Sequence, residues 1–174
     1  MIYHSALGIN TFVLFERTLD DTLNAISLAP EFTATRPSAE ELEVLRTNRE
    51  LPREFYYDRF HGVRNCYVVM RGSEPAYIHW IYVKGDANRF LRLGDGVAEI
   101  NYITTLPEFR GKGLMASMMV LAMNELKMLG YKKVVSVVNA TNPPAVKNMR
   151  AAGFKEVRRI RTLGFLNRRY SVHE

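Results

Sequence analysis

The chain has 174 residues, 47% of them apolar, and a formal net charge of +6 at pH 7. This length and apolar content suit one domain with a single two- or three-layer core, and no apolar run approaches the ~20 residues that a membrane span requires. The first residues lack the basic and then apolar pattern of a secretory signal, and the single cysteine, Cys66, excludes an internal disulfide. We therefore expect one domain over residues 1–174, in the cytoplasm and without membrane association.

The first third of the chain is predicted to alternate strands with short helices. In chain order, strands are expected at residues 10–17 and 32–36, and helices at residues 18–27, 38–48 and 52–62. Ser38 and Glu41 have the spacing of a capping box, in which each side chain bonds a free backbone amide at the start of a helix. Pro52 suits the first turn of a helix, where no amide hydrogen is required.

The rest of the chain is predicted to form a sheet with two longer helices. Strands are expected at residues 65–71, 76–83, 98–105, 133–138, 154–163 and 165–172, and helices at residues 112–129 and 142–152. Residues 72–74, Gly-Ser-Glu, suit a hairpin turn, and Gly130 is placed to end the longer helix. Residues 85–96 are predicted to form a polar loop. The pattern indicates an α/β or α+β domain around one sheet.

The most informative segment is residues 104–116, which lead from a strand through a tight turn into an apolar helix. The first turn of a helix has backbone amides without partners, and the helix dipole makes this end positive. Gly111 and Gly113 lack a Cβ, so an anion can approach the backbone closely, and Arg110 and Lys112 add two positive charges. The segment therefore predicts a site for a diphosphate.

Three classes of nucleotide cofactor are considered as ligands of this turn. The remaining alternative is an ordinary charged turn that binds no ligand. A P-loop requires four residues between its first glycine and a Gly-Lys-Ser/Thr ending, which the sequence does not contain. Residues 111–116 satisfy the G-x-G-x-x-A pattern of dinucleotide-binding proteins. The next strand, however, ends at Asn139 without the carboxylate that binds a ribose. We therefore rank a dinucleotide second.

The third class is an acyl-coenzyme A. Residues 107–114, Pro-Glu-Phe-Arg-Gly-Lys-Gly-Leu, resemble the acyl-CoA-binding motif of the GCN5-related N-acetyltransferase superfamily, which reads Gln/Arg-x-x-Gly-x-Gly/Ala after a strand. Arg110 and Gly113 match its first and fourth positions, whereas Met115 stands where Gly or Ala is usual. A second match lies downstream, where an asparagine opens a helix and Gly-Phe precedes the next strand: Asn142, Ala145, Asn148, Gly153 and Phe154.

The resemblance implies both a fold and a binding site. The fold would be a mixed α/β (α+β) sheet of about six to seven strands flanked by about four helices. Two parallel strands, at residues 98–105 and 133–138, would splay apart like a V around the pantetheine arm, and residues 1–30 would form an atypical N-terminal extension. No metal is implied. The residues expected to bind acetyl-CoA or another acyl-CoA are Ile103, Thr104, Thr105, Leu106, Arg110, Gly111, Lys112, Gly113, Leu114, Met115, Asn142, Ala145 and Asn148.

The implied reaction is direct attack of a neutral amine on the thioester, which requires a base to accept the amine proton. Glu99 is the first candidate base, with an exposed strand carboxylate as the alternative reading, and His79 on the neighbouring strand is the second. Many members of the superfamily protonate the leaving thiolate with a Tyr in the last helix, but Met149 occupies that position here. Tyr102 or Cys66 could take that role. The same departure leaves open a protein that binds CoA without catalysis.

The acceptor is expected to be a small-molecule amine. The segments that would contact it, residues 51–61 and 84–96, carry several arginines and tyrosines and suggest an anionic or sugar-like molecule, so amino sugars and sugar nucleotides are candidates. Tyr57 and Trp80 are the candidate stacking platforms. A basic cluster within residues 158–169 is interpreted as a solvated surface, with a nucleic-acid-binding domain as the weakest alternative. We expect no nucleic-acid partner and a monomer or homodimer.

Overall fold

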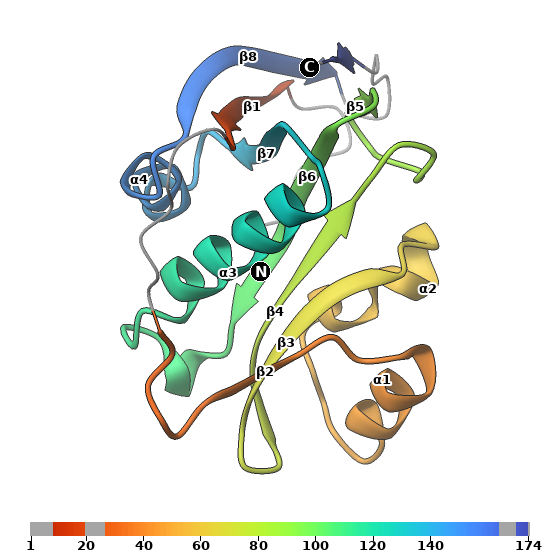
Figure 1. Ribbon diagram of the computed structural model, residues 1–174, viewed down its shortest axis with the longest axis vertical. Helices are drawn as coiled ribbons and strands as arrows, with labels where there is room; N and C mark the ends of the chain where they lie inside the picture. Colours follow the sequence, from red (N-terminus) through yellow and green to blue (C-terminus); the bar gives the residue numbers. More distant parts are fainter. Residues whose placement is uncertain (1–8, 20–26, 164–169, 174) are drawn as a thin grey trace.

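A computed structural model describes residues 9–19, 27–163 and 170–173 of the chain (Figure 1). The strands are β1 (Ile9–Thr18), β2 (Thr33–Thr35), β3 (Asn65–Arg71), β4 (Glu74–Tyr82), β5 (Leu91–Leu93), β6 (Val97–Thr105), β7 (Lys133–Asn139), β8 (Lys155–Leu163) and β9 (Tyr170–Val172). The helices are α1 (Ala39–Arg46), α2 (Tyr57–His61), α3 (Leu114–Met128) and α4 (Pro143–Ala151), with short 3-10 helices η1 (Arg53–Tyr56) and η2 (Pro107–Phe109). No helix in the described ranges is long and apolar enough to cross a membrane.

Seven of the strands form one mixed sheet in the order β2-β3-β4-β6-β7-β1-β8. Its neighbours pair antiparallel, except β6 and β7, which run parallel. Figure 1 shows α3 lying along the middle of this sheet, with α1 and α2 on the side of β2 and β3 and α4 beside β8. The predicted mixed sheet with flanking helices is therefore confirmed.

Local sequence signals account for several of the element boundaries. The capping box of α1 is present: the Ser38 hydroxyl accepts the Glu41 amide at 3.2 Å, and the Glu41 carboxylate accepts the Ser38 amide at 2.7 Å. Gly130 follows the end of α3 with φ +88°, a left-handed conformation that glycine adopts without strain. The helix expected at residues 52–62 is instead divided into η1 and α2.

One expected element differs because its partner is distant in the sequence. Residues 85–96, predicted to form a polar loop, contain β5, which pairs in parallel with β9 in a two-stranded sheet. A strand of three residues is too short to show an alternating pattern, so only its long-range pairing identifies it. Of the strand expected at residues 165–172, the structure describes only the last part, which is β9. Most of the helix expected at residues 18–27 lies outside the described residues.

The strand β1 lies inside the sheet, between β7 and β8, and pairs antiparallel with both. Its residues Val13, Leu14 and Phe15 are all buried, so both faces of the strand are covered. The described part of the N-terminal stretch is thus integrated into the main sheet.

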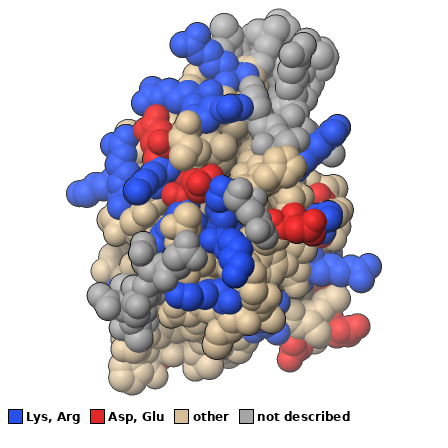
Figure 2. Space-filling view, turned by 45° about the horizontal axis from the view of Figure 1, so that its top comes forward, with Lys and Arg blue, Asp and Glu red and all other residues tan. Residues whose placement is uncertain are grey.

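Basic side chains cover much of the surface at the β8 end of the molecule, where Figure 2 shows them interrupted by acidic groups. Arg158, Arg159 and Arg161 on β8 are exposed, and Arg159 pairs with Glu156 at 2.9 Å. Glu156 also pairs with Arg150 of α4, at 3.1 Å. Arg168 and Arg169, which complete the predicted cluster, lie outside the described residues.

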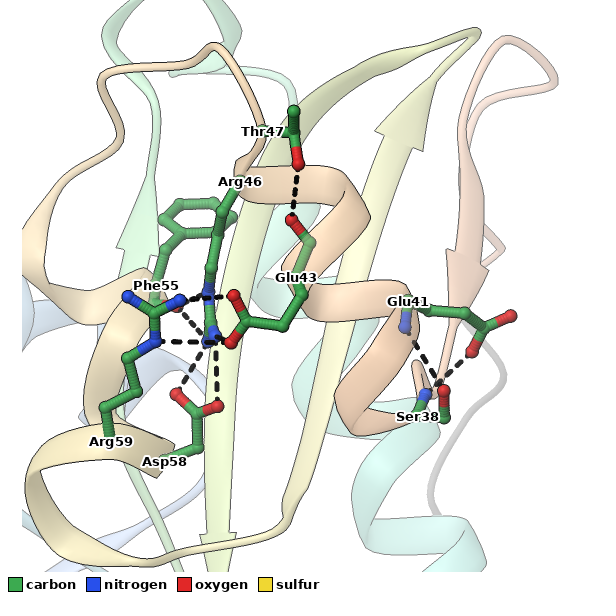
Figure 3. A network of polar contacts seen from close by, with 8 residues as sticks. All are labelled: Ser38, Glu41, Glu43, Arg46, Thr47, Phe55, Asp58 and Arg59. Atoms are coloured by element: carbon green, nitrogen blue, oxygen red, sulfur yellow. Dashed lines mark hydrogen bonds and ion pairs between the residues drawn. The ribbon is translucent and has the colours of Figure 1, made fainter.

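A buried arginine joins α1 to the η1–α2 segment (Figure 3). Arg46 is 6% exposed, and its Nε and Nη2 donate to the carbonyl oxygen of Phe55 at 2.9 and 2.6 Å. Its guanidinium also pairs with Asp58 at 2.6 Å and with Glu43 at 2.9 Å. A buried charge is tolerated only when it is paired and hydrogen-bonded, so these contacts fix the position of η1 and α2 relative to α1.

Candidate active site

The parallel strands β6 and β7 separate part of the way along their length. Their paired residues are Val97 with Lys133, Ala98 with Val134 and Glu99 with Val135. Beyond Glu99 the strand β6 continues to Thr105, whereas the end of β7 pairs on its other side with β1 as far as Asn139. The strands therefore diverge at Glu99, as the predicted V requires, and the backbone of β6 beyond this point has no ladder partner in β7.

A β-bulge interrupts β6 directly after the point of divergence. Ile78 and Trp80 on β4 pair with Thr104 and Asn101, so β6 has one extra residue between them. Tyr102 has φ +52°, a left-handed conformation that is uncommon for a residue with a side chain. The Asn101 side-chain oxygen accepts the Tyr102 amide at 2.8 Å, which helps to hold this conformation.

The bulge changes which side chains of β6 share a face. Residues that pair directly across an antiparallel ladder point to the same side of the sheet. Tyr82 pairs with Glu99, Trp80 with Asn101 and Ile78 with Thr104. Ile103 and Thr105 therefore do not share the face of Glu99, because one extra residue reverses the alternation. Thr104 lies on that face instead.

Glu99 is a buried carboxylate with a hydrogen-bond donor on each oxygen. The residue is 1% exposed. Asn101 Nδ2 donates to Oε1 at 2.7 Å, and Asn88 Nδ2 donates to Oε2. Burial raises the pKa of Glu99 to about 8, and the hydrogen bond from Asn101 opposes this shift. The alternative of an exposed surface Glu is wrong, since the side chain is enclosed.

Asn88 is a site residue that sequence reasoning missed. Its side-chain oxygen accepts the amides of Phe90 and Leu91 at 3.0 and 3.1 Å, so its orientation is fixed by the backbone that enters β5. The same side chain donates to Glu99 through Nδ2. Its only sequence signal is an asparagine at a turn, and nothing local connects it with a strand eleven residues later.

Two tyrosines lie near Glu99. The Tyr82 hydroxyl is buried and has no hydrogen-bond partner among the described residues. Burial raises the pKa of Tyr82, and the charges of Tyr102 and Glu99 raise it further. Tyr102 is half-buried with its ring centroid 5.8 Å from that of Tyr82, and burial raises its pKa as well. Both phenols are therefore protonated at neutral pH and can act only as donors of a proton.

The structure does not bring His79 or Cys66 into contact with Glu99. His79 is three residues from Tyr82 on β4, so it points to the opposite face of the sheet. It is fully buried, with Nδ1 3.0 Å from the Tyr77 hydroxyl, and burial lowers its pKa to about 3. Cys66 is also buried, which raises the pKa of its thiol to about 12. Its thiol is enclosed and not acidic.

The buried, neutral His79 predicts a loss of stability in acid. An unfolded histidine titrates near 6.5, and the folded one titrates near 3, so its contribution is complete above pH 6.5 and is lost as pH falls towards 3. At pH 4 this loss amounts to about 3 kcal/mol of unfolding free energy. The variant His79→Phe should lose less stability between pH 7 and pH 4 than the wild type. Urea unfolding at the two pH values measures this, and equal losses in both proteins would contradict it.

The turn between β6 and α3 has the predicted open backbone. Gly111 and Gly113 have φ +76° and +72°, and apart from the glycine and its chain neighbours no protein atom lies within 4 Å of the Cβ that a side chain would add at either position. Gly113 is the N-cap of α3 and supplies no side chain to its free amides. Arg110, exposed, donates from Nε to the Thr105 carbonyl at 3.3 Å, so the guanidinium lies over the end of β6.

The second motif lies beside this turn. Asn148 Nδ2 is 3.6 Å from the sulfur of Met115, which joins α4 to the first turn of α3. The Asn142 side chain caps α4 by accepting the Ala145 amide at 3.3 Å. Met149, in the position of the missing Tyr, is buried. The structure therefore brings Met115 and Asn148, one residue from each of the two motifs, into contact.

The other predicted cofactor-binding residues divide into exposed and buried ones. Leu106 and Leu114 are buried in the core, so only their backbone could contact a ligand. Lys112 is exposed in the turn, and Ile103, Thr104 and Thr105 are half-buried on the free part of β6. Among the described residues no group of three His, Cys, Asp or Glu side chains is close enough to hold a metal.

One of the two predicted stacking platforms, Trp80, is enclosed and cannot contact a ligand. Trp80 is 0% exposed, and its indole Nε1 donates to the Glu54 carbonyl at 2.7 Å. The expectation that Trp80 stacks on a ligand is therefore wrong, because the ring is packed under η1. Tyr57 is half-buried, with its ring centroid 4.0 Å from that of Tyr102.

A shallow pocket on the molecule lies away from these residues. It is formed by β3, β4 and the C-terminal half of α3, and includes Tyr67, Ile81 and Leu126. Arg36 and Glu125, which also line it, form an ion pair with each other. Neither Glu99 nor the glycine turn contributes to this pocket.

Comparison with known proteins gave one family and several structures of similar fold. The profile of the Acetyltransferase (GNAT) family matches residues 28–154. A search of curated proteins gave no significant match. A tandem GNAT protein from the clavulanic acid biosynthesis pathway is similar in structure, with TM-score 0.65 and 15% identity over 87% of this chain and 51% of that one.

Two further solved structures show the same fold. A GNAT-family protein of Novosphingobium aromaticivorans has TM-score 0.61 and 18% identity over 88% of this chain and 63% of that one. A GCN5-related N-acetyltransferase of Sphaerobacter thermophilus has TM-score 0.60 and 13% identity over 92% and 54%. This chain thus spans only about half to two thirds of the length of these structures. The profile match covers well over half of the chain, and the chain belongs to the acetyltransferase (GNAT) family.

Proposed function

We propose that the protein transfers an acyl group from an acyl-CoA, with acetyl-CoA as the default donor, to the amine of a small molecule. The observation that carries the proposal is the position of Glu99. This buried carboxylate lies where β6 and β7 separate, and the same strand β6 leads into the open glycine turn of α3. A candidate base and a candidate diphosphate site are therefore connected by a stretch of β6 that pairs with β4 but has no ladder partner in β7.

The donor would bind along β6 and the start of α3. The free amides of the first turn of α3, together with Arg110 and Lys112, suit the diphosphate of CoA. The backbone of residues 103–105 has no ladder partner in β7 and can bond the pantetheine amides. An amide of the bulge near Tyr102 would bond the thioester carbonyl and stabilise the negative charge that develops on its oxygen.

The chemical step would be attack of the neutral amine on the thioester carbon. The nitrogen–carbon bond forms, the carbon–sulfur bond breaks, and the CoA thiolate departs. The amine proton passes to the carboxylate form of Glu99, directly or through a water molecule. The phenol of Tyr102, which stays protonated at neutral pH, is our candidate to supply a proton to the thiolate.

The basic test supplies acetyl-CoA with a panel of small-molecule amines and measures release of free thiol. Calorimetry with CoA alone tests the donor site independently of any acceptor. The second candidate function, a protein that binds CoA without turnover, is favoured by Met149, which has no proton to give. That alternative predicts CoA binding and no thiol release with any amine. Absence of CoA binding would exclude both functions.

The glycine turn allows a matched pair of variants. Gly113→Ala should weaken CoA binding by about tenfold or more, because a methyl group enters the space where the diphosphate approaches the backbone. Gly130→Ala introduces a similar left-handed alanine at the other end of α3, with φ +88° against +72°. Calorimetry with CoA should show the loss only for Gly113→Ala, while both variants lose similar thermal stability. Equal CoA affinity in the two variants would argue against the turn as the diphosphate site.

A further inference from the structure

Four aromatic side chains form a patch next to Glu99, which we call the aromatic patch: Tyr57, Phe60 and His61 of α2, and Tyr102 of β6. The ring centroid of Tyr57 lies 4.0 Å from that of Tyr102 and 4.9 Å from that of His61. His61 is 5.4 Å from Tyr102, and Phe60 is 6.3 Å from Tyr57. Phe60 is 58% exposed and the other three are half-buried, so the patch faces solvent.

Two arginines from different parts of the chain lie near Glu99: Arg53 contacts the patch itself, and Arg89 follows Asn88, the residue that donates to Glu99. The guanidinium of Arg53, in η1, lies 4.9 Å from the ring centroid of Phe60 and 5.8 Å from that of Tyr57. The guanidinium of Arg89, before β5, lies 4.7 Å from the Phe90 ring and 5.6 Å from the Phe12 ring. Stacking on a ring holds a guanidinium in place and leaves the N–H groups at its edge free to bind an anion.

Arg53 and Arg89 have no acidic partner among the described residues. Two other arginines of the same region do have acidic partners: Arg46 pairs with Asp58, and Arg59 pairs with Glu43. Both side chains are exposed. Their charges act on the same groups, since the pKa of His61 is lowered by burial and then by Arg53 and Arg89. Arg53 and Arg89 therefore add positive potential at the patch, while the carboxylates of Glu54 and Glu99 contribute negative potential nearby.

The patch is also adjacent to the candidate base. Tyr102 is the bulge residue of β6, three positions after Glu99, and the charge of Glu99 acts on its phenol. The ring of Tyr102 lies 5.8 Å from that of Tyr82, which pairs with Glu99 across the ladder. A molecule lying on the patch would thus reach from the two guanidinium groups to the neighbourhood of Glu99.

We propose that the acceptor is a small amine that also carries an anionic group, with Arg53 and Arg89 binding the anion and the aromatic patch contacting the body of the molecule. The inference rests on the proposed function, because it assigns the acceptor side of the same site. A carboxylate and a phosphate offer the same chemistry to a guanidinium. Polycationic amines are disfavoured, because two arginines without an ion-pair partner among the described residues repel them.

The experiment compares each anionic amine with its neutral counterpart. The carboxylate arm uses phenylalanine against phenylethylamine, and the phosphate arm uses glucosamine 6-phosphate against glucosamine. Thiol release from acetyl-CoA gives kcat/KM, and calorimetry in the presence of CoA gives acceptor affinity without turnover. The variants are the double substitution Arg53→Gln/Arg89→Gln and the control Arg59→Gln. Arg59 is also exposed and stacked, 5.5 Å from the Tyr56 ring, but is paired with Glu43.

We expect a preference of about tenfold or more for the anionic amine in at least one arm, because hydrogen bonds to charged groups are among the strong ones. The preference should nearly disappear in the double variant and persist in Arg59→Gln. The arm that shows it identifies carboxylate or phosphate. Equal use of both amines in both arms, or a preference that survives the double substitution, would overturn the inference. Thiol release in the same assays would still support the proposed function.

The experiment also distinguishes the reverse case, in which acyl transfer fails but the assignment of the acceptor-binding arginines holds. If no amine is acylated but an anionic amine binds to the CoA complex and loses affinity in the double variant, the assignment of Arg53 and Arg89 stands and catalysis is refuted. If the anionic amines bind no better than the neutral ones to the wild type, the assignment of these arginines is wrong.

Discussion

Replacement of Glu99 by Gln should lower kcat for acyl transfer by about 10²- to 10⁴-fold, the range expected for the loss of a general base. The substitution keeps the size of the side chain but removes its ability to accept the amine proton. CoA binding should be unchanged, because Glu99 lies at the point where the strands separate and not in the glycine turn. Steady-state kinetics and CoA calorimetry together measure both effects.

The pH dependence of the wild type provides a second readout of Glu99. A base works in its deprotonated form, so kcat/KM should rise with pH through a midpoint near the pKa of about 8. The amide of the Glu99→Gln variant cannot titrate, so this variant should lack the rise. Glu74→Gln, at an exposed carboxylate on β4 that pairs with Arg71, is the matched control and should keep the wild-type profile. A Glu99→Gln enzyme with full activity and the same pH profile would remove Glu99 from the mechanism.

Reversal of the charge at Arg110 should weaken CoA binding by about 100-fold, since a lost charge-assisted hydrogen bond and a new repulsion act together. Arg110 is exposed, and its contact in the structure is one long bond to the Thr105 carbonyl. The Arg110→Glu variant should therefore fold normally. Calorimetry with CoA measures the affinity, and thermal unfolding checks the fold.

The control for Arg110→Glu is Arg64→Glu. Arg64 is exposed just before β3, and this variant changes the net charge of the protein by the same amount. Any general loss of attraction for a polyanion would appear in both variants. Equal loss of CoA affinity in both would show that the net charge, and not the turn, dominates binding.

The features of the site that could be predicted from the sequence are those defined by neighbouring residues. Gly111 and Gly113 next to Arg110 indicated an open, positive turn, and the structure shows left-handed glycines with free space around them. The capping box of Ser38 and Glu41 likewise depends on four consecutive residues. In such cases the local chemistry alone determines the backbone geometry.

The features that could not be predicted depend on contacts between distant segments. Asn88 reaches Glu99 across eleven residues, and no local pattern indicates this. The bulge at Tyr102 is a mismatch between β6 and β4, so it exists only when the two strands pair. Arg53 and Arg89 act on the same side chain, His61, only because the fold brings η1 and the loop before β5 near it. The enclosure of Trp80 likewise depends on η1, which is distant from it in the sequence.

The location of β1 has a consequence for how the chain assembles. Thr18 pairs with Lys133 and Ile9 with Leu163, so β1 completes its hydrogen bonds only after the much later strands β7 and β8 have emerged from the ribosome. Until then its apolar residues Val13 and Phe15 are not covered by the rest of the core. Insertion of this strand also closes the open edges that β7 and β8 would otherwise offer to other molecules. Misassembly during slow synthesis should therefore begin at this end of the sheet.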